Sequence, residues 1–277
     1  MPELPEVETV VRTLRPRLVG EAIRAVWSSG LALRQRRAVD EASLRRRCQG
    51  ARVGAVSRRG KFILIDLERR SHRAGTLLVH LGMTGRLRLE SADAPREKHT
   101  HLVWRLSGGR ELRFVDPRRF GWVAVAAAAS ALPELAALGP DALDGLERQA
   151  FAQSLAKSSA PVKSFLLDQR RLAGLGNIYA SEALFRAGIH PRTLARRTVA
   201  KADELRRAIR RTLALGIRNC GTSFRDFVDA SGEPGTNLDA LRVYGRKDQA
   251  CRTCGGPIRR RVDAGRSTFF CARCQRR

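Results

Sequence analysis

The C-terminal stretch CRTCGGPIRRRVDAGRSTFFCARC, residues 251–274, holds two C-x2-C pairs. The paired residues are Cys251 with Cys254 and Cys271 with Cys274. Each pair can supply two thiolates from one tight turn, and this spacing is typical of a zinc ribbon. Gly255, directly after the first pair, allows the left-handed backbone that such a turn needs. The end of the chain therefore predicts a small metal-stabilised domain.

The four cysteines admit two interpretations. Four thiolates fill a tetrahedral site and leave no open position, so we expect one structural Zn²⁺ and no metal in catalysis. The alternative is a pair of disulfides, which secreted proteins favour. Because the acidic start of the chain shows no signal-peptide pattern, we favour zinc.

Composition narrows the function classes. The chain has 277 residues and carries 53 Lys and Arg against 27 acids, a formal net charge of +26. A strongly basic protein usually binds a polyanion, so nucleic acid is the expected partner. The alternative is a high-GC genome that favours arginine codons. No stretch approaches the roughly 18 apolar residues of a membrane span, so we expect no membrane.

Turn residues and periodicity predict an α+β multidomain fold. A helix is expected from about Pro5 to Leu18, because apolar residues recur there at helical spacing. Short apolar runs then predict strands of an antiparallel β-sandwich, at Ala51–Ser57, Lys61–Leu67, Thr76–Leu81, Gly85–Leu89, His101–Leu106 and Glu111–Val115. Helical periodicity takes over from about Phe151. We expect a β-sandwich domain at 1–130, a linker at 131–150, a helical domain at 151–240 and the zinc ribbon at 241–277.

The helical region contains RLAGLGNIYASEALFRAGIHP at residues 171–191. Asn177 is expected as an N-cap, and a helix N-terminus reached through glycines can bind a phosphate. A preceding helix at Pro161–Arg171 would complete a helix-turn-helix-like unit that clamps a DNA backbone. An ordinary helical hairpin explains the pattern equally well.

Two loops could carry an apolar wedge. In VDPRRFGW, residues 115–122, Arg118 and Arg119 precede Phe120 at an expected loop tip. Arginine beside an exposed aromatic suits a wedge that enters a base stack, whereas the alternative buries Phe120 in the core. Met83, in LGMTG, is expected in the core or as an exposed apolar finger.

The start, MPELPEVETV, has two parts. Pro5 and Glu6 suit the first turn of a helix. Pro2 and Glu3 are left unexplained by that interpretation.

Further along, Lys61 heads an apolar strand, which would place its ammonium at a strand end. His99 and His101 alternate as on a strand, and a phosphate contact or a plain surface position is expected for the exposed one.

Taken together and in order, these motifs resemble bacterial formamidopyrimidine-DNA glycosylases. The resemblance rests on MPELPEVET, HLGMTG, DPRRFG, LGNIYASEALF with AGIHP, VYGR and the four-cysteine ribbon, and it spans residues 2–274. The family contains a sandwich domain with a leading helix, a helix-two-turn-helix domain and a zinc finger. The resemblance implies a bifunctional DNA glycosylase and AP lyase that excises oxidised purines from double-stranded DNA.

The family implies roles for the unexplained start. Removal of Met1 would leave Pro2 with a free secondary amine, which would attack the deoxyribose C1′ and form a Schiff base. Glu3 would be the adjacent acid and base. Lys61 matches the family's general acid. Arg266 matches the zinc-finger arginine that grips phosphates at the flipped nucleotide, and we group it with the catalytic residues.

The family also implies DNA contacts. Met83 would fill the space left by the flipped base, Phe120 would insert beside the orphan base, and Arg118 would hydrogen-bond the orphan cytosine. The other matching positions are Arg119, His99, Lys163 and Asn177. Glu6 matches a helix carboxylate that faces the pocket, and its structural role in the helix start stays open beside that.

The chain departs from the family pattern at Ser159, where a basic residue is common, and at Thr236-Asn237, where an aromatic often follows Pro-Gly. A lid over the flipped base is expected within residues 221–239. Two rival functions are a non-catalytic damaged-DNA binder and a transcription-associated zinc ribbon, the second of which explains the C-terminus alone. We expect a monomer in the bacterial cytoplasm, associated with the nucleoid through DNA.

Overall fold

The structure is a computed structural model that describes every residue except 1, 34–38, 71, 225 and 277. The chain divides into two compact units, and each is described by itself. Unit 1 comprises Met1–Ala137 and Asn219–Thr236, and unit 2 comprises Leu138–Arg218 and Asn237–Arg277. The predicted domain boundaries stay a prediction. Within the described residues, no helix is long and apolar enough to cross a membrane.

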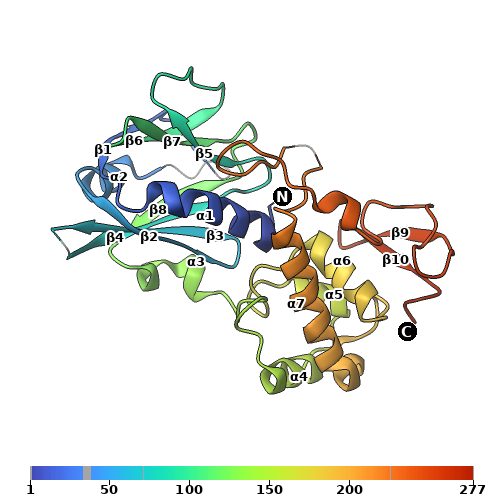
Figure 1. Ribbon diagram of the computed structural model, residues 1–277. Coiled ribbons are helices and arrows are strands. Elements are labelled where there is room, and N and C mark those ends of the chain that lie inside the picture. The colour runs from blue at the N-terminus through green and yellow to red at the C-terminus, as the bar shows by residue number, and fades with distance from the viewer. Residues whose placement is uncertain (1, 34–38, 71, 225, 277) are drawn as a thin grey trace. The chain divides into compact units, whose positions relative to one another are not determined.

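Unit 1 is a β-sandwich with a leading helix (Figure 1). Its helices are α1 (Leu4–Leu18), α2 (Glu41–Cys48), the 3₁₀ turn η1 (Ala129–Ala131) and α3 (Pro133–Ala136). Its strands are β1 (Ile23–Ser28), β2 (Arg52–Arg59), β3 (Phe62–Arg69), β4 (His72–His80), β5 (Arg86–Ser91), β6 (Thr100–Leu106), β7 (Arg110–Val115) and β8 (Trp122–Ala126). The strands form two antiparallel sheets, ordered β1-β6-β7-β5 and β2-β3-β4-β8. The predicted leading helix and antiparallel sandwich are confirmed.

One hydrophobic core holds unit 1 together. Helix α1 buries one apolar face, including Val7, Val11 and Leu14, in the same cluster as side chains from both sheets. Trp104 on β6 and Phe114 on β7 are fully buried there. Burial of this apolar surface is the main favourable term in folding, and it fixes the N-terminus of α1 on the sandwich.

Unit 2 combines helices with a terminal hairpin (Figure 1). Its elements are α4 (Arg148–Ala156), α5 (Val162–Leu167), α6 (Asn177–Arg186), η2 (Ala195–Lys201), α7 (Ala202–Arg218), η3 (Asn237–Ala240), β9 (Ile258–Asp263) and β10 (Arg266–Cys271). Strands β9 and β10 pair antiparallel, with Ile258 opposite Cys271 at one end and Asp263 opposite Arg266 at the other. The predicted helical domain and C-terminal ribbon are confirmed.

Two local predictions in unit 2 were wrong. The helix expected at Pro161–Arg171 ends at Leu167, because the Gln169 amide donates to the carbonyls of Leu167 and Leu175 and stabilises a turn. Asn177 is not the N-cap of α6. Gly176 takes that place with extended backbone, and the Asn177 side chain turns away to the β9–β10 hairpin.

Candidate functional site

A capping box orders the described residues at the start of α1. Glu3 is the N-cap and forms a capping box with Glu6, in which the Glu3 N–H donates to Glu6 Oε2 at 2.8 Å. Pro2, Glu3 and Glu6 are all buried. Because a capping box satisfies orphan N–H groups reciprocally, it fixes the backbone that directly follows Pro2. The predicted removal of Met1 concerns a residue outside the described ones.

Glu6 has a second partner, which sequence reasoning missed. Its Oε1 accepts the backbone N–H of Thr222 at 2.7 Å, so the helix carboxylate tethers the loop expected to be the lid. Gly221, before Thr222, has a φ of +83°, and a Cβ there would lie 2.9 Å from the Phe227 ring and 3.0 Å from Glu6 Cγ. Gly221 was the available signal, because only glycine allows this close approach.

The register of one sheet gathers three of the predicted segments. His80 at the end of β4 pairs with Phe62 at the start of β3 and with Trp122 at the start of β8. Lys61 directly precedes Phe62, HLGMTG runs on from His80, and DPRRFG directly precedes Trp122. These segments therefore meet at one end of the β2-β3-β4-β8 sheet.

Helix α1 reaches the same end of the sheet. Glu8, one turn into α1, pairs with the nearly buried Arg58 at 3.1 Å, and Arg58 also donates to the carbonyl of Gly60. Lys61 follows Gly60 and is buried. Unit 1 thus brings together the Pro2–Glu3 terminus and the Lys61 turn.

The loops at this end expose their apolar residues. Met83 is 41% exposed and Phe120 is 37% exposed, so neither packs in the core. The Arg118 guanidinium lies 4.6 Å from the centroid of the Phe120 ring, within the range of a cation–π contact. A Cβ on Gly82 would lie 2.3 Å from the nitrogen of Gly121, so the two loops touch. Of the two interpretations left open for each residue, the exposed one is correct.

Asp116 builds the DPRRFG turn. Its fully buried carboxylate accepts the Thr84 hydroxyl at 2.6 Å and the N–H groups of Arg118 and Gly121 at 3.2 and 2.7 Å. Arg119 next to them adopts a positive φ of 54°. This network holds Arg118 and Phe120 on a shaped tip, because every oxygen of the buried carboxylate is satisfied.

The two predicted histidines have different environments. His99 is exposed with a φ of +69°, in the turn before β6. His101 is buried, and its Nε2 lies 3.0 Å from the carbonyl of Asp116 while its Nδ1 lies 3.2 Å from Ser29 Oγ. Burial lowers the pKa of His101, which favours the neutral ring. Because a carbonyl oxygen can only accept, Nε2–H donates to the Asp116 carbonyl. The pattern expected one exposed histidine, and His99 is that one.

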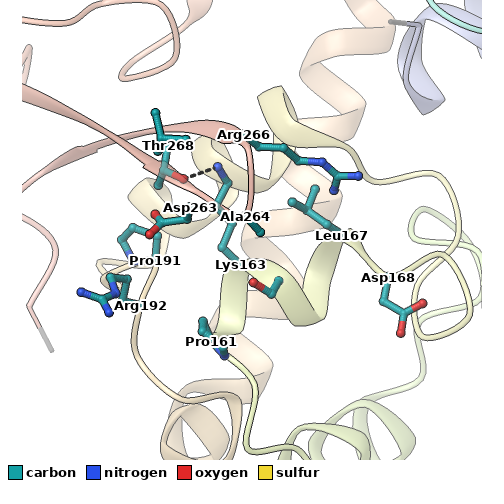
Figure 2. Close-up of a pocket in the computed structure, with 12 residues that line it drawn as sticks. Pro161, Lys163, Leu167, Asp168, Pro191, Arg192, Asp263, Ala264, Arg266 and Thr268 are labelled. Carbon is teal, nitrogen blue, oxygen red and sulfur yellow. Dashed lines mark hydrogen bonds between the residues drawn. The ribbon is translucent and has the colours of Figure 1, made fainter.

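In unit 2, the side chains of Lys163 and Asn177 both contact the β9–β10 hairpin that carries Arg266, and Figure 2 shows Lys163 and Arg266. The buried Lys163 ammonium donates to the Ser267 carbonyl at 3.1 Å and to Thr268 Oγ1 at 2.8 Å. The Asn177 amide donates to the same Ser267 carbonyl at 2.9 Å. Both side chains hold the residue that follows Arg266. The buried Oδ1 of Asn177 accepts no hydrogen bond from the residues that the structure describes.

A cavity of about 630 Å³ opens beside this hairpin (Figure 2). The exposed Arg266 and Arg192 line it together with Asp168 and Asp263. Guanidinium groups on an open wall suit contacts to phosphate oxygens. The arrangement presents Arg266 from a hairpin that buried hydrogen bonds hold in place.

The four ribbon cysteines fit a zinc ion. Their sulfur atoms all lie within 4.8 Å of one another, with Cys251 and Cys274 3.9 Å apart and Cys254 and Cys271 3.4 Å apart. A tetrahedral site with Zn–S bonds of about 2.3 Å needs sulfur separations of about 3.8 Å, whereas a disulfide bond is about 2.05 Å long. The site is therefore that of one structural Zn²⁺, and the disulfide alternative is wrong.

The two remaining cysteines lie outside this cluster. Cys48 is buried in the core of unit 1, where burial raises the pKa of its thiol to about 12. Cys220 is exposed at the start of the loop that Glu6 tethers.

Glu182 on α6 is a positioning residue that the sequence did not reveal. Its buried carboxylate accepts the N–H groups of Arg242, Val243 and Tyr244 at 2.8–2.9 Å, and burial raises its pKa while these N–H groups oppose the rise. The Tyr244 hydroxyl in turn lies 3.3 Å from the Asn177 amide. Glu182 belongs to the motif NIYASE, and the N–H groups that it accepts belong to the segment around VYGR. The two motifs are about 60 residues apart in the sequence, so a single sequence does not show that they pair.

Comparison with known proteins gives consistent matches. Family models match residues 1–123 (formamidopyrimidine-DNA glycosylase N-terminal domain), 138–228 (formamidopyrimidine-DNA glycosylase H2TH domain) and 248–277 (zinc finger found in FPG and IleRS). Formamidopyrimidine-DNA glycosylase of Moorella thermoacetica is 46% identical over 94% of this chain and 94% of its own length. That of Legionella pneumophila is 41% identical over 99% of this chain and 98% of its own.

Solved structures agree with the sequence matches. A Lactococcus lactis FPG mutant in complex with Fapy-dG-containing DNA is 33% identical, covers both chains completely and superposes with a TM-score of 0.90. The MutM (Fpg) protein of Thermus thermophilus is 40% identical, with a TM-score of 0.86 over 99% of this chain and 98% of its own.

Proposed function

The chain belongs to the formamidopyrimidine-DNA glycosylase family, and from this premise we propose that it is a bifunctional DNA glycosylase and AP lyase of base excision repair. It flips an oxidised purine out of double-stranded DNA, excises the base and then cleaves the strand. The observation that carries the proposal is the meeting of the capped Pro2–Glu3 terminus, the Lys61 turn and the two exposed wedge loops at one end of a sheet.

The chemistry starts at the N-terminus. With Met1 removed, Pro2 carries a secondary amine, and the pKa of an N-terminal amine is near 8, so a useful fraction is unprotonated at neutral pH. Its lone pair attacks C1′ of the damaged nucleotide, the C1′–N bond breaks, and the base leaves with a proton. The product is an iminium that joins Pro2 to the opened sugar.

Glu3 and Lys61 handle the protons. Glu3 protonates the ring oxygen as the sugar opens and then accepts a proton. The iminium acidifies the C2′ hydrogens, so loss of one breaks the C3′–O bond, and a second elimination breaks the C5′–O bond. Lys61 contacts the phosphate and assists elimination. Arg266, held through the Lys163 and Asn177 contacts to Ser267, grips phosphates beside the flipped nucleotide.

The exposed loops hold the distorted duplex. Met83 fills the space of the extruded base, Phe120 wedges beside the orphan base, and Arg118 hydrogen-bonds the orphan cytosine. Met83 and Phe120 are both exposed, and the buried Asp116 carboxylate accepts hydrogen bonds from Thr84 in one loop and Gly121 in the other. These contacts support the proposed roles. The enzyme works in the bacterial cytoplasm at the nucleoid, because its substrate is the chromosome.

An end-labelled duplex with one 8-oxoguanine opposite cytosine tests the function. We expect base release and strand cleavage at the lesion, with phosphates on both sides of the gap, and no cleavage of the unmodified duplex. A panel with formamidopyrimidine and oxidised pyrimidine lesions then ranks the substrates. Tight binding of the damaged duplex without nicking would favour the non-catalytic DNA-binding protein instead.

A further inference from the structure

A second basic feature lies in unit 1, away from the residues assigned above. A cavity of about 370 Å³ is lined by Arg46, Arg47, Arg69, His72 and Arg73, which we name the distal basic patch. Helix α2 supplies the first two residues, and the β3–β4 hairpin supplies the others. Lys61 directly precedes β3 and Arg69 ends it, so the patch and the proposed catalytic end lie at opposite ends of this strand, about 23 Å apart at ~3.3 Å per residue.

Backbone carbonyls hold two arginines of the patch, Arg69 and Arg47. Arg69 Nη2 donates to the carbonyls of Gln49 and Arg46 at 2.7 and 3.2 Å, and Arg47 Nη1 donates to the carbonyl of Ala74 at 3.0 Å. These bonds join the C-terminus of α2 to the hairpin. Because they use carbonyls as acceptors, they hold the guanidinium groups in place without neutralising them.

Charge compensation in this corner is incomplete. Helix α2, its N-cap and residues 68–73 contain the acids Asp40, Glu41 and Glu68, whereas their cations are Arg45, Arg46, Arg47, Arg69, Arg70 and Arg73. The pKa of Asp40 is lowered mainly by its hydrogen bonds from Ser43, and the charge of Arg46 adds to this effect. Among the described residues, Glu41 pairs with Arg45 at 3.6 Å, on the rim of the patch. Repulsion between the gathered positive charges destabilises this corner, and a bound anion would relieve that repulsion.

The shape of the patch favours a polymer of phosphates. The lining residues occupy one cavity, and exposed Arg45 and Arg70 extend the positive surface along α2 and the hairpin beyond it. Arginine forks suit phosphate oxygens, and an extended row of them suits a sugar–phosphate backbone. A single small anion would need only the cavity.

From this placement, we propose that the distal basic patch is a second, sequence-independent DNA-binding site that takes the backbone of a separate duplex segment. A duplex seated on the Lys61 end of unit 1 leaves the opposite end of β3 available. The enzyme then holds two segments at once and passes between them without full release. This inference goes beyond the proposed catalysis, and the duplex-loading step of its test rests on the proposed function.

The test uses the full-length, zinc-loaded protein. The protein is first saturated with a short unlabelled duplex that carries a tetrahydrofuran abasic analogue, and a labelled undamaged duplex is then titrated and followed by fluorescence anisotropy. The patch variant is R46Q/R70Q/R73Q, and all three of its side chains are exposed. The control R210Q/R211Q/R218Q removes the same charge from exposed positions of α7.

We expect the loaded wild type and the control to bind the second duplex and the patch variant to bind it at least tenfold more weakly. The slope of log affinity against log salt should become shallower by up to about 2.7 in the patch variant, at about 0.9 for each lost phosphate contact. Base release from a short lesion-containing duplex should stay unchanged in both variants. Equal losses in patch variant and control would overturn the proposal, as would no second duplex on the wild type.

Two further outcomes are informative. Displacement of the labelled duplex from the patch by inorganic phosphate at low concentration would show a small-anion site and overturn the proposal. Failure of the tetrahydrofuran duplex to load would count against the proposed function. In that case the affinity for the undamaged duplex is measured without loading, for the wild type, the patch variant and the control. The patch variant should again bind at least tenfold more weakly than the other two.

Discussion

At Phe120, the molecule exposes an aromatic ring that packing does not require. The ring is 37% exposed and lies under Arg118. In Phe120→Ala, the free energy of unfolding should change by less than about 0.5 kcal/mol, as at other surface positions. Single-turnover base release should slow at least about tenfold, because the proposed wedge beside the orphan base is lost. Val19→Ala, at an exposed apolar residue of the same unit, is the control and should affect neither quantity.

Glu6 accepts hydrogen bonds from the start of α1 and from the loop expected to be the lid, so one substitution perturbs both segments. Glu6→Gln replaces one acceptor oxygen by an NH₂ group and leaves a buried N–H of Glu3 or Thr222 without its partner. The free energy of unfolding should fall by about 1–3 kcal/mol, and lesion excision should fall with it. Chemical denaturation and an excision assay measure both.

The matched control for Glu6 is Glu90→Gln, at a partly exposed pair with Arg88. That change should cost less than about 1 kcal/mol. Equal stability of the two variants would contradict the tether.

At the scale of elements, the zinc ribbon can be tested separately from unit 1. Cys254→Ser removes one thiolate, so zinc content should fall from one ion per chain to nearly none, and the β9–β10 hairpin should lose its order. DNA affinity should drop because Arg266 is presented from that hairpin. Unit 1 should keep the near-ultraviolet circular dichroism of its buried Trp104 and Trp122.

Cys220→Ser is the control for the ribbon, since Cys220 is exposed and outside the cluster. It should keep zinc and DNA affinity, as measured by metal analysis and anisotropy. Zinc retained by Cys254→Ser at the wild-type level would contradict the four-thiolate site.

How well the sequence predicted each element depended on local signal. Helix α1 and the ribbon carry caps, periodicity or cysteine spacing, and both were predicted. Helix α2 was missed because it buries only Leu44 and Cys48, too few apolar positions for a helical period. Its N-cap Asp40, which accepts the Ser43 N–H at 2.9 Å, was the one available signal. Strand β1 was missed because residues 23–28 lack clear alternation.

The site itself depended on long-range pairing. Sheet order β2-β3-β4-β8 and the register of His80 with Phe62 and Trp122 bring the Lys61, Met83 and Phe120 segments together. A single sequence indicates strands but not which distant strands pair. Family resemblance suggested the same residues by position, without the geometry that groups them. The tether of Glu6 to Thr222 was missed for the same reason, because Gly221 indicates a close approach but not which distant residue makes it.

At the scale of the whole molecule, the net charge of +26 has a measurable consequence. If the charge serves DNA binding, the affinity for a lesion duplex should fall linearly on a log–log plot against salt. For six to ten phosphate contacts, the loss between about 50 and 200 mM salt is about 10³–10⁵-fold. Anisotropy titrations measure it. An affinity independent of salt would instead favour arginine content set by the genome's composition.

The covalent intermediate tests the central claim most directly. Borohydride added during reaction with an 8-oxoguanine duplex should reduce the iminium and leave one enzyme–DNA adduct that lacks Met1. Peptide mapping by mass spectrometry should locate that adduct on Pro2, and Pro2→Gly should trap far less. An adduct on a lysine such as Lys61, equal trapping by Pro2→Gly, or no trapping by the mature protein would contradict the account.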